Sequence, residues 1–184
     1  MPTNGFINMV KSQWGPIPYP TQSYKDKTVI VTGSNTGLGL ESARHFARLG
    51  ATKVILACRS ISKGEAAARD ITSSLKLKEN VVEVWEIDMA NWDSIKKFVK
   101  RAEGLERLDV VVENAGIARS EFVLTEEGWE SGVAVNVIGT FLLALNLLPI
   151  LRKSTQRSGE IGRIVVLTSG VHAWVILPSP PSDF

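Results

Sequence analysis

Short apolar runs alternate with longer amphipathic stretches along this chain of 184 residues. The apolar runs are rich in β-branched residues, as is typical of parallel strands that are buried on both faces. They predict five strands, at Thr28–Gly33, Lys53–Cys58, Val81–Asp88, Leu108–Gly116 and Arg163–Ser169.

The stretches between the first four strands show the spacing of helices that bury one face. The apolar positions are Ala43, Phe46 and Ala47, then Ala67, Ile71 and Leu75, then Ile95, Val99 and Ala102. Gly50 is a suitable stop for the first helix, and Asn91 is a suitable cap for the third. Because strands alternate with helices, we expect an α/β fold: a Rossmann-like, doubly wound parallel sheet of about five strands with helices on both faces.

The longest apolar stretch, residues 131–151, predicts a fourth helix. It holds no charged residue and is long enough to span a bilayer. However, Asn136, Gly139, Asn146 and Pro149 interrupt it, and its first half is weakly apolar. We therefore expect no membrane span, and favour a helix that is buried on two sides, against the sheet and against a partner.

One domain accounts for most of the chain. Residues 1–26 show little periodicity and several prolines, which predicts an extended N-terminal arm. Residues 27–174 form the predicted dinucleotide-binding Rossmann domain, and residues 175–184 form a Pro-rich tail.

Composition narrows the classes of function. Hydrophobic residues make up 44% of the chain and charged residues 22%, as in globular proteins. A net charge of +2 without a basic block gives no support for binding to nucleic acid. Cys58 is the only cysteine, and His45 and His172 lie far apart, so we expect neither a disulfide framework nor a metal site. The first ten residues do not resemble a secretory signal, so we expect a cytoplasmic protein.

The turn after the first strand, VTGSNTGLGLE, contains Gly33, Gly37 and Gly39. Glycine permits positive φ and lets a phosphate approach the backbone, while the helix that follows offers unpaired N–H groups. At this point of a βαβ unit, a pyrophosphate is the expected ligand. A tight turn with close packing of helix on strand would explain the same glycines. The spacing is neither that of the G-x-G-x-x-G fingerprint nor that of a P-loop.

The end of the second strand bears on the choice of cofactor. An acidic residue there commonly holds the adenosine ribose, but this chain has Cys58 followed by Arg59. A guanidinium suits a 2′-phosphate, and Lys63 lies one helical turn further on. We therefore expect NADP (NADPH) and consider NAD less favoured, the alternative being that both cations are solvated surface residues.

These motifs together resemble the short-chain dehydrogenase/reductase family, and most closely its retinol-dehydrogenase-like branch of fungal secondary metabolism. Thr32–Gly39 resembles the cofactor loop, Asp88 the adenine contact, and Glu113–Gly116 the Asn-Asn-Ala-Gly motif with Glu113 in place of the first Asn. The resemblance assigns cofactor binding to Gly33, Ser34, Asn35, Thr36, Gly37, Leu38, Gly39, Asp88, Met89, Asn114, Ala115 and Gly116. Asn136 and Ser169 match the catalytic Asn and Ser.

The resemblance implies hydride transfer between a nicotinamide and a small-molecule carbonyl or alcohol. In the family a Tyr exchanges the proton, a Lys lowers its pKa, the Ser orients the substrate oxygen and the Asn fixes a water. Here the only tyrosines are Tyr19 and Tyr24 and the last lysine is Lys153, so the family's Tyr-x-x-x-Lys and last strands are missing.

The main expectation is therefore an oxidoreductase that is impaired by C-terminal truncation. Two alternatives stay open: a non-catalytic nucleotide-binding or scaffold protein, and a repurposed pocket for a non-redox step such as cyclisation. We also expect the fifth strand to form an exposed sheet edge, and expect a homo-oligomer through that strand and the fourth helix.

Overall fold

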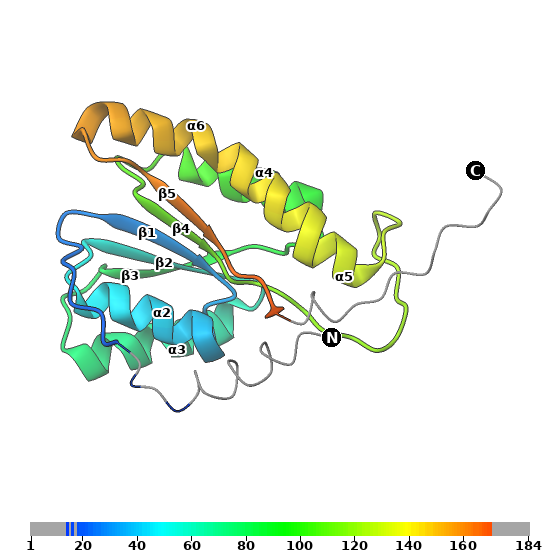
Figure 1. The fold of residues 1–184 in the computed structure, drawn as a ribbon, viewed down its shortest axis with the longest axis horizontal. Helices are drawn as coiled ribbons and strands as arrows, with labels where there is room; N and C mark the ends of the chain where they lie inside the picture. Colours follow the sequence, from blue (N-terminus) through cyan, green and yellow to red (C-terminus); the bar gives the residue numbers. More distant parts are fainter. Residues whose placement is uncertain (1–13, 15, 17, 171–184) are drawn as a thin grey trace.

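A computed structural model describes residues 14, 16 and 18–170. In this part of the chain, one parallel sheet lies between two layers of helices (Figure 1). The strands are β1 Thr28–Thr32, β2 Lys53–Cys58, β3 Val82–Glu86, β4 Val110–Glu113 and β5 Arg163–Val166. The helical segments are α2 Gly37–Arg48, α3 Ile61–Leu75, α4 Trp92–Ala102, α5 Ser131–Val133, the π-helical η1 Ala134–Gly139, and α6 Thr140–Ser158. The predicted Rossmann-like architecture is confirmed; most of the predicted N-terminal arm and the whole Pro-rich tail lie outside the described residues.

The strand order is β3-β2-β1-β4-β5, and every neighbouring pair is parallel. β2 and β3 are added in turn on one side of β1, and β4 and β5 are added in turn on its other side. The order therefore reverses between β1 and β4, and in such sheets ligands bind beyond the carboxyl ends of the strands at the reversal. As predicted, β5 lies at an edge of the sheet.

The two faces of the sheet bury separate apolar cores. Val29 and Val31 of β1 point to the side covered by α2 and α3, where Ala43, Ala47 and Ile71 are buried. Ile30 points to the opposite side, which α4 and α6 cover. Burial on both faces explains why β1, β2 and β4 are nearly continuous apolar runs.

The predicted helix signals act as expected. The Asn91 side chain caps α4, because its Oδ1 accepts a hydrogen bond of 2.8 Å from the backbone N–H of Ser94. Gly50 follows the end of α2 with a φ of 89°, a left-handed conformation that glycine adopts without steric cost.

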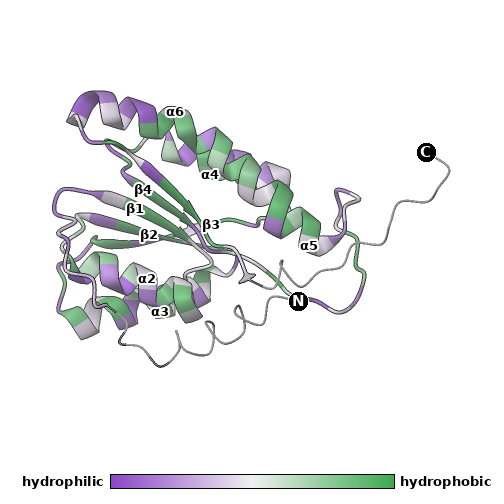
Figure 2. Cartoon of the chain, viewed as in Figure 1, coloured by the Kyte–Doolittle hydropathy of each residue, from purple (hydrophilic) through white to green (hydrophobic). Residues whose placement is uncertain are grey.

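The predicted fourth helix is not one uniform α-helix. It runs through α5, η1 and α6, and its Leu143 and Leu147 are fully buried in the core over the sheet. Ser131–Ser158 is long and apolar enough to cross a membrane, but 44% of its most apolar window is buried in this fold. Its other side exposes an apolar stripe of Val133, Val137, Phe141 and Leu145, and Figure 2 shows the hydrophobic character of this end of the helix.

Four strands end earlier than predicted. β1 ends at Thr32, one residue early, and β3, β4 and β5 end at Glu86, Glu113 and Val166, two or three residues early. At β4 the cause is visible, because the Thr32 hydroxyl accepts hydrogen bonds from the backbone N–H groups of Asn114 and Ala115. These two N–H groups bond a side chain and not the backbone of a neighbouring strand, so the strand pairing ends here.

Candidate cofactor site

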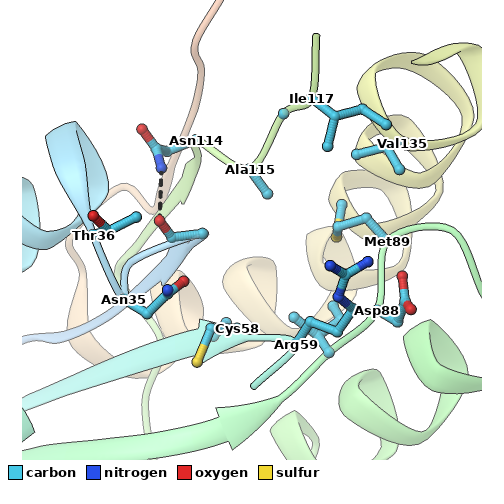
Figure 3. A pocket seen from close by; sticks show the side chains of 14 residues that line it. Asn35, Thr36, Cys58, Arg59, Asp88, Met89, Asn114, Ala115, Ile117 and Val135 are labelled. Carbon is cyan, nitrogen blue, oxygen red and sulfur yellow. Dashed lines mark hydrogen bonds between the residues drawn. The ribbon is translucent and has the colours of Figure 1, made fainter. Parts of the chain in front are cut away.

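A cavity of about 270 Å³ opens at the carboxyl ends of the strands, where the strand order reverses (Figure 3). Its walls come from the turn after β1, the end of β2, the segment after β3, the segment after β4, and η1. The lining residues are Gly33, Asn35, Thr36, Ala57, Cys58, Arg59, Ile87, Asp88, Met89, Asn114, Ala115, Gly116, Ile117 and Val135.

The glycine turn forms the wall after β1. A Cβ on Gly33 would lie 2.9 Å from the Cα of Ala115, and a Cβ on Gly39 would overlap the Asn114 side chain and the Gly33 carbonyl. Those two glycines therefore serve close packing. Gly33 and Gly37 both have positive φ, 64° and 59°, but Gly37 differs because no atom lies within 4 Å of the position that a Cβ would take.

The first residues of α2 match the donor set that a phosphate needs. α2 begins at Gly37, and its N-cap residue Thr36 makes no side-chain hydrogen bond to the helix. The first backbone N–H groups of a helix have no partner within the helix, and the helix dipole favours an anion there. The open backbone at Gly37 and these donors fit a pyrophosphate.

Three other predicted cofactor-binding residues, Ser34, Leu38 and Lys63, do not line the cavity. Ser34 is fully buried, and its hydroxyl donates a 2.7 Å hydrogen bond to the Val31 carbonyl, so it holds the turn from beneath. Leu38 is 78% exposed and does not line the cavity. Lys63 is also exposed and off the lining, and its backbone N–H bonds the Ser60 hydroxyl that caps α3.

The end of β2 forms the second wall, with Cys58 and Arg59 (Figure 3). Cys58 is 2% exposed, and burial, together with the nearby Glu86 carboxylate, raises the pKa of its thiol. A neutral thiol offers no negative charge to a ribose. The Arg59 side chain points into the cavity from the exposed rim, so this wall presents a cation to a ligand.

The segment after β3 contributes Asp88 and Met89. The Asp88 backbone N–H donates to the Ser94 hydroxyl at 2.8 Å, and its Oδ1 accepts from the Ala90 backbone N–H at 2.9 Å. The side chain is therefore held in a local turn at the first residues of α4. Its position on the lining fits the predicted contact with an adenine ring.

The segment after β4 is tied to the glycine turn. The Asn114 side-chain nitrogen donates to the carbonyls of Thr32 and Gly33, at 2.9 and 3.3 Å. Thr32 Oγ1 in turn accepts from the Asn114 and Ala115 backbone N–H groups, at 3.0 and 2.9 Å. Two walls of the cavity thus share one hydrogen-bond network.

Asn136 lies on the π-helical η1 and clamps the segment after β4. Its Oδ1 accepts from the Ile117 N–H and its Nδ2 donates to the Ile117 carbonyl, both at 2.8 Å. These two bonds hold the main chain of Ile117, which lines the cavity. π-Helical turns are rare and are often found at functional sites.

Ser169 lies three residues beyond the end of β5, is exposed, and is not on the lining of this cavity. His172 lies outside the described residues. The other predicted catalytic residue, Asn136, is linked to the cavity wall through Ile117.

A search of protein-family models supplies the identity. The model of the short chain dehydrogenase family matches residues 27–174. This chain belongs to the short-chain dehydrogenase family. The family resemblance of the sequence motifs is therefore confirmed, and the family is one of oxidoreductases.

Curated fungal relatives agree with this assignment. The short chain dehydrogenase/reductase dmxR8 of Cryptosporiopsis sp. is 44% identical over 163 residues, which cover 88% of this chain and 50% of that protein. The short chain dehydrogenase atnD of Emericella nidulans is 47% identical over 164 residues, which cover 88% of this chain and 51% of that protein. The chain spans about half the length of these curated relatives.

Solved structures of short-chain dehydrogenases have the same fold. One from Shigella flexneri, complexed with NADP, superposes with a TM-score of 0.68 at 28% identity, covering 84% of this chain and 63% of that one. One from Escherichia coli CFT073, complexed with NADPH, has a TM-score of 0.68 at 30% identity with the same two coverages.

Sequence reasoning missed several features of this short-chain dehydrogenase site. Ile87, Ile117 and Val135 line the cavity, but an apolar side chain in the sequence carries no sign that distinguishes a cavity wall from the core. The π-helical segment was missed because its residues have ordinary helical spacing. The substitution at Glu113 was visible in the sequence, but its burial was not.

Proposed function

We propose that this short-chain dehydrogenase binds NADP(H) in the cavity at the carboxyl ends of the strands. The supporting observation is that one cavity gathers the glycine turn, Arg59, Asp88 and the segment after β4. These are the groups that a dinucleotide phosphate needs: backbone donors, a cation, and a polar side chain beside an apolar wall. The NADP and NADPH complexes of the related structures are consistent with this choice.

Each group has a proposed task. The N–H groups at the start of α2 bind the pyrophosphate, Arg59 binds the 2′-phosphate, and Asp88 contacts the adenine. Asn114 keeps the glycine turn in register with the segment after β4, and Asn136 holds Ile117 at the cavity wall. Lys63 is a second cation for the 2′-phosphate only if its long side chain turns toward the cavity.

The proposed reaction is that of the family. A bound nicotinamide would give a hydride to a carbonyl carbon, or take one from an alcohol carbon. In this chain Ser169 is the candidate for orienting the substrate oxygen. Asn136 is the candidate for ordering a water for the proton relay, since its exposed amide keeps one N–H donor and one acceptor site beyond its two bonds to Ile117. The family's Tyr-x-x-x-Lys does not occur in these 184 residues, which span about half the length of the curated relatives. Nucleotide binding without turnover is the second candidate function.

Titration of NADPH and NADH into the 184-residue chain, followed by nicotinamide fluorescence, tests the binding step. We expect NADPH to bind more tightly than NADH, because only NADPH has a 2′-phosphate for Arg59. Equal affinities would contradict the assignment of Arg59, and no binding of either would contradict the proposed function. Binding without NADPH oxidation, over a panel of carbonyl substrates, would support the non-catalytic alternative.

If a carbonyl substrate is reduced, Ser169→Ala tests the catalytic assignment. We expect a rate at least about a hundred-fold lower, since correctly placed polar groups in proton-transfer chemistry contribute on this scale. Ser73→Ala, at an exposed position of α3, is the matched control and should keep the rate. A Ser169→Ala variant that keeps its rate would remove Ser169 from the site. Product formed without consumption of NADPH would instead support a non-redox reaction.

We further infer a homo-oligomer. The support is the exposed edge of β5, where Val165 and Val166 are 47% and 36% exposed, and the apolar stripe of Val133, Val137, Phe141 and Leu145. Apolar surface of this kind favours association.

A further inference from the structure

Glu113 is a carboxyl group inside the protein, directly behind the cofactor cavity. It is the last residue of β4 and is 2% exposed. Alternation along the strand places it on the same face as Val111, toward α6 and away from α2 and α3. Its Oε1 is buried and has no hydrogen-bond partner in the described part of the chain, and its Oε2 lies 3.4 Å from Thr32 Oγ1. A buried carboxylate with one neutral partner is unfavourable, so the protonated acid suits this position.

Thr32 connects this acid to the cavity. Its Oγ1 accepts hydrogen bonds from the backbone N–H groups of Asn114 and Ala115. The Thr32 hydroxyl hydrogen can then be donated to Glu113 Oε2 or to the Val112 carbonyl oxygen, each 3.4 Å from Oγ1. The Thr32 carbonyl accepts from the Asn114 side chain. The two segments that line opposite sides of the cavity therefore meet at the residue beside Glu113.

We propose that Glu113 is a positioning residue for the cofactor cavity: the neutral acid fits the buried space beside Thr32, whereas the carboxylate, whose Oε1 has no hydrogen-bond partner there, draws in water and loosens the end of β4 that carries Asn114 and Ala115. The inference rests on the proposed binding of NADP(H). Glu113 does not line the cavity and touches no cofactor, so its effect passes through Thr32.

The surroundings of Glu113 support the protonated form. Burial raises the pKa of this carboxyl to about 8, against a smaller lowering by the Thr32 hydrogen bond. β1 and η1 contain no titratable side chain. The charged residues of the neighbouring elements lie at far ends: Arg163 of β5 pairs with Val110, and Arg152, Lys153 and Arg157 belong to the C-terminal part of α6.

The direction of the pH effect follows from these values. In the unfolded chain Glu113 ionises near the ordinary value of 4.5, whereas in the folded protein it ionises near 8. The stability that Glu113 contributes is therefore greatest in acid and falls as pH rises from about 4.5 to 8. Above pH 8 the carboxylate is charged within the fold, and we expect the cavity to bind NADPH less well.

The test measures the dissociation constant of NADPH from pH 7 to 9.5 for the wild-type chain, Glu113→Gln and Cys58→Ser. For the wild type we expect the constant to rise by up to about ten-fold per pH unit above 8, the limit for one linked proton. Glu113→Gln keeps the shape and a neutral polar group, so its constant should change less than about two-fold. Cys58→Ser should keep the alkaline loss, because the thiol is the other group at the cavity whose pKa is raised. An alkaline loss that persists in Glu113→Gln, or its absence in the wild type, would overturn the proposal.

Hydrogen exchange at the backbone amides of Asn114 and Ala115 gives a readout that needs no cofactor. After correction for the intrinsic rate, we expect protection to fall about ten-fold between pH 7.5 and 9.5 in the wild type and to stay constant in Glu113→Gln. If NADPH binds to no variant at any pH, the proposed function fails, but the exchange measurement still decides the role of Glu113. Equal exchange in both proteins would overturn that role.

Discussion

The proposed choice of cofactor rests on one residue, Arg59. The chain has Cys58 and Arg59 where an acidic residue would hold the ribose hydroxyls of NAD. The structure places both on the cavity lining, with the thiol buried and the guanidinium at the exposed rim. Preference for NADPH is therefore expected to depend on the charge of one side chain.

Replacing Arg59 with Ala should weaken NADPH binding by about ten- to a hundred-fold, because a hydrogen bond to a charged group contributes about 1.5–3 kcal/mol. The affinity for NADH should change less than about two-fold. Fluorescence titration of both cofactors gives the two constants. Arg69→Ala removes an exposed cation of α3 away from the cavity and serves as the control. Equal losses for NADPH and NADH would show that Arg59 does not contact the 2′-phosphate.

At the scale of elements, close backbone approaches hold the cavity walls together. Gly39 brings α2 against the Asn114 side chain and the Gly33 carbonyl. Gly139, the last residue of η1, packs against the carbonyl of Met89 in the same way. Neither contact leaves room for a Cβ, so helices from both layers pack directly onto loops that line the cavity.

Gly39→Ala should therefore damage both stability and binding. The new methyl group would overlap atoms that cannot move without shifting the turn, and overpacking of this kind costs about 1–3 kcal/mol. Thermal unfolding should show a lower midpoint, and NADPH titration a weaker affinity. Gly104→Ala is the matched control, since its Cβ would lie 3.4 Å from the Arg101 carbonyl oxygen and its φ is outside the left-handed region. Equal midpoints for the two variants would contradict this account of the packing.

At the scale of the whole molecule, one side of the described fold is much less covered than the other. β1, β2 and β4 are buried on both faces, whereas three of the four residues of β5 are exposed. Leu145 on the outer side of α6 is 62% exposed. Both features leave apolar groups and open backbone positions facing solvent, which favours self-association.

We expect light scattering to show dimers or larger species of the 184-residue chain. Val165→Lys places a charge on the edge strand, and Leu145→Glu places one on the apolar stripe. The variant at the true interface should shift the population toward the monomer, because a buried unpaired charge is strongly unfavourable. Leu38→Glu adds the same charge at an exposed leucine of α2 and should leave the mass unchanged. A monodisperse monomer of the wild-type chain would contradict the proposed oligomer.

The sequence by itself determined the fold class and much of the cavity. The apolar runs and helical spacings determine the βα alternation, because parallel strands need buried faces and crossover helices. The glycines, Arg59, Asp88 and the segment from Asn114 to Gly116 were predictable because each has a chemical reason at a strand end.

Only the tertiary structure decided which of these groups share a cavity. It placed Gly33 on the lining and Gly37, Gly39, Ser34 and Lys63 off it, and it showed that, of these three glycines, only Gly37 has open space where a Cβ would stand. It also showed that Glu113 is buried beside Thr32, a contact between residues 81 positions apart. Periodicity records which face of a strand is apolar, but the meeting of two loops depends on strand order, and that order is set by packing across the whole sheet.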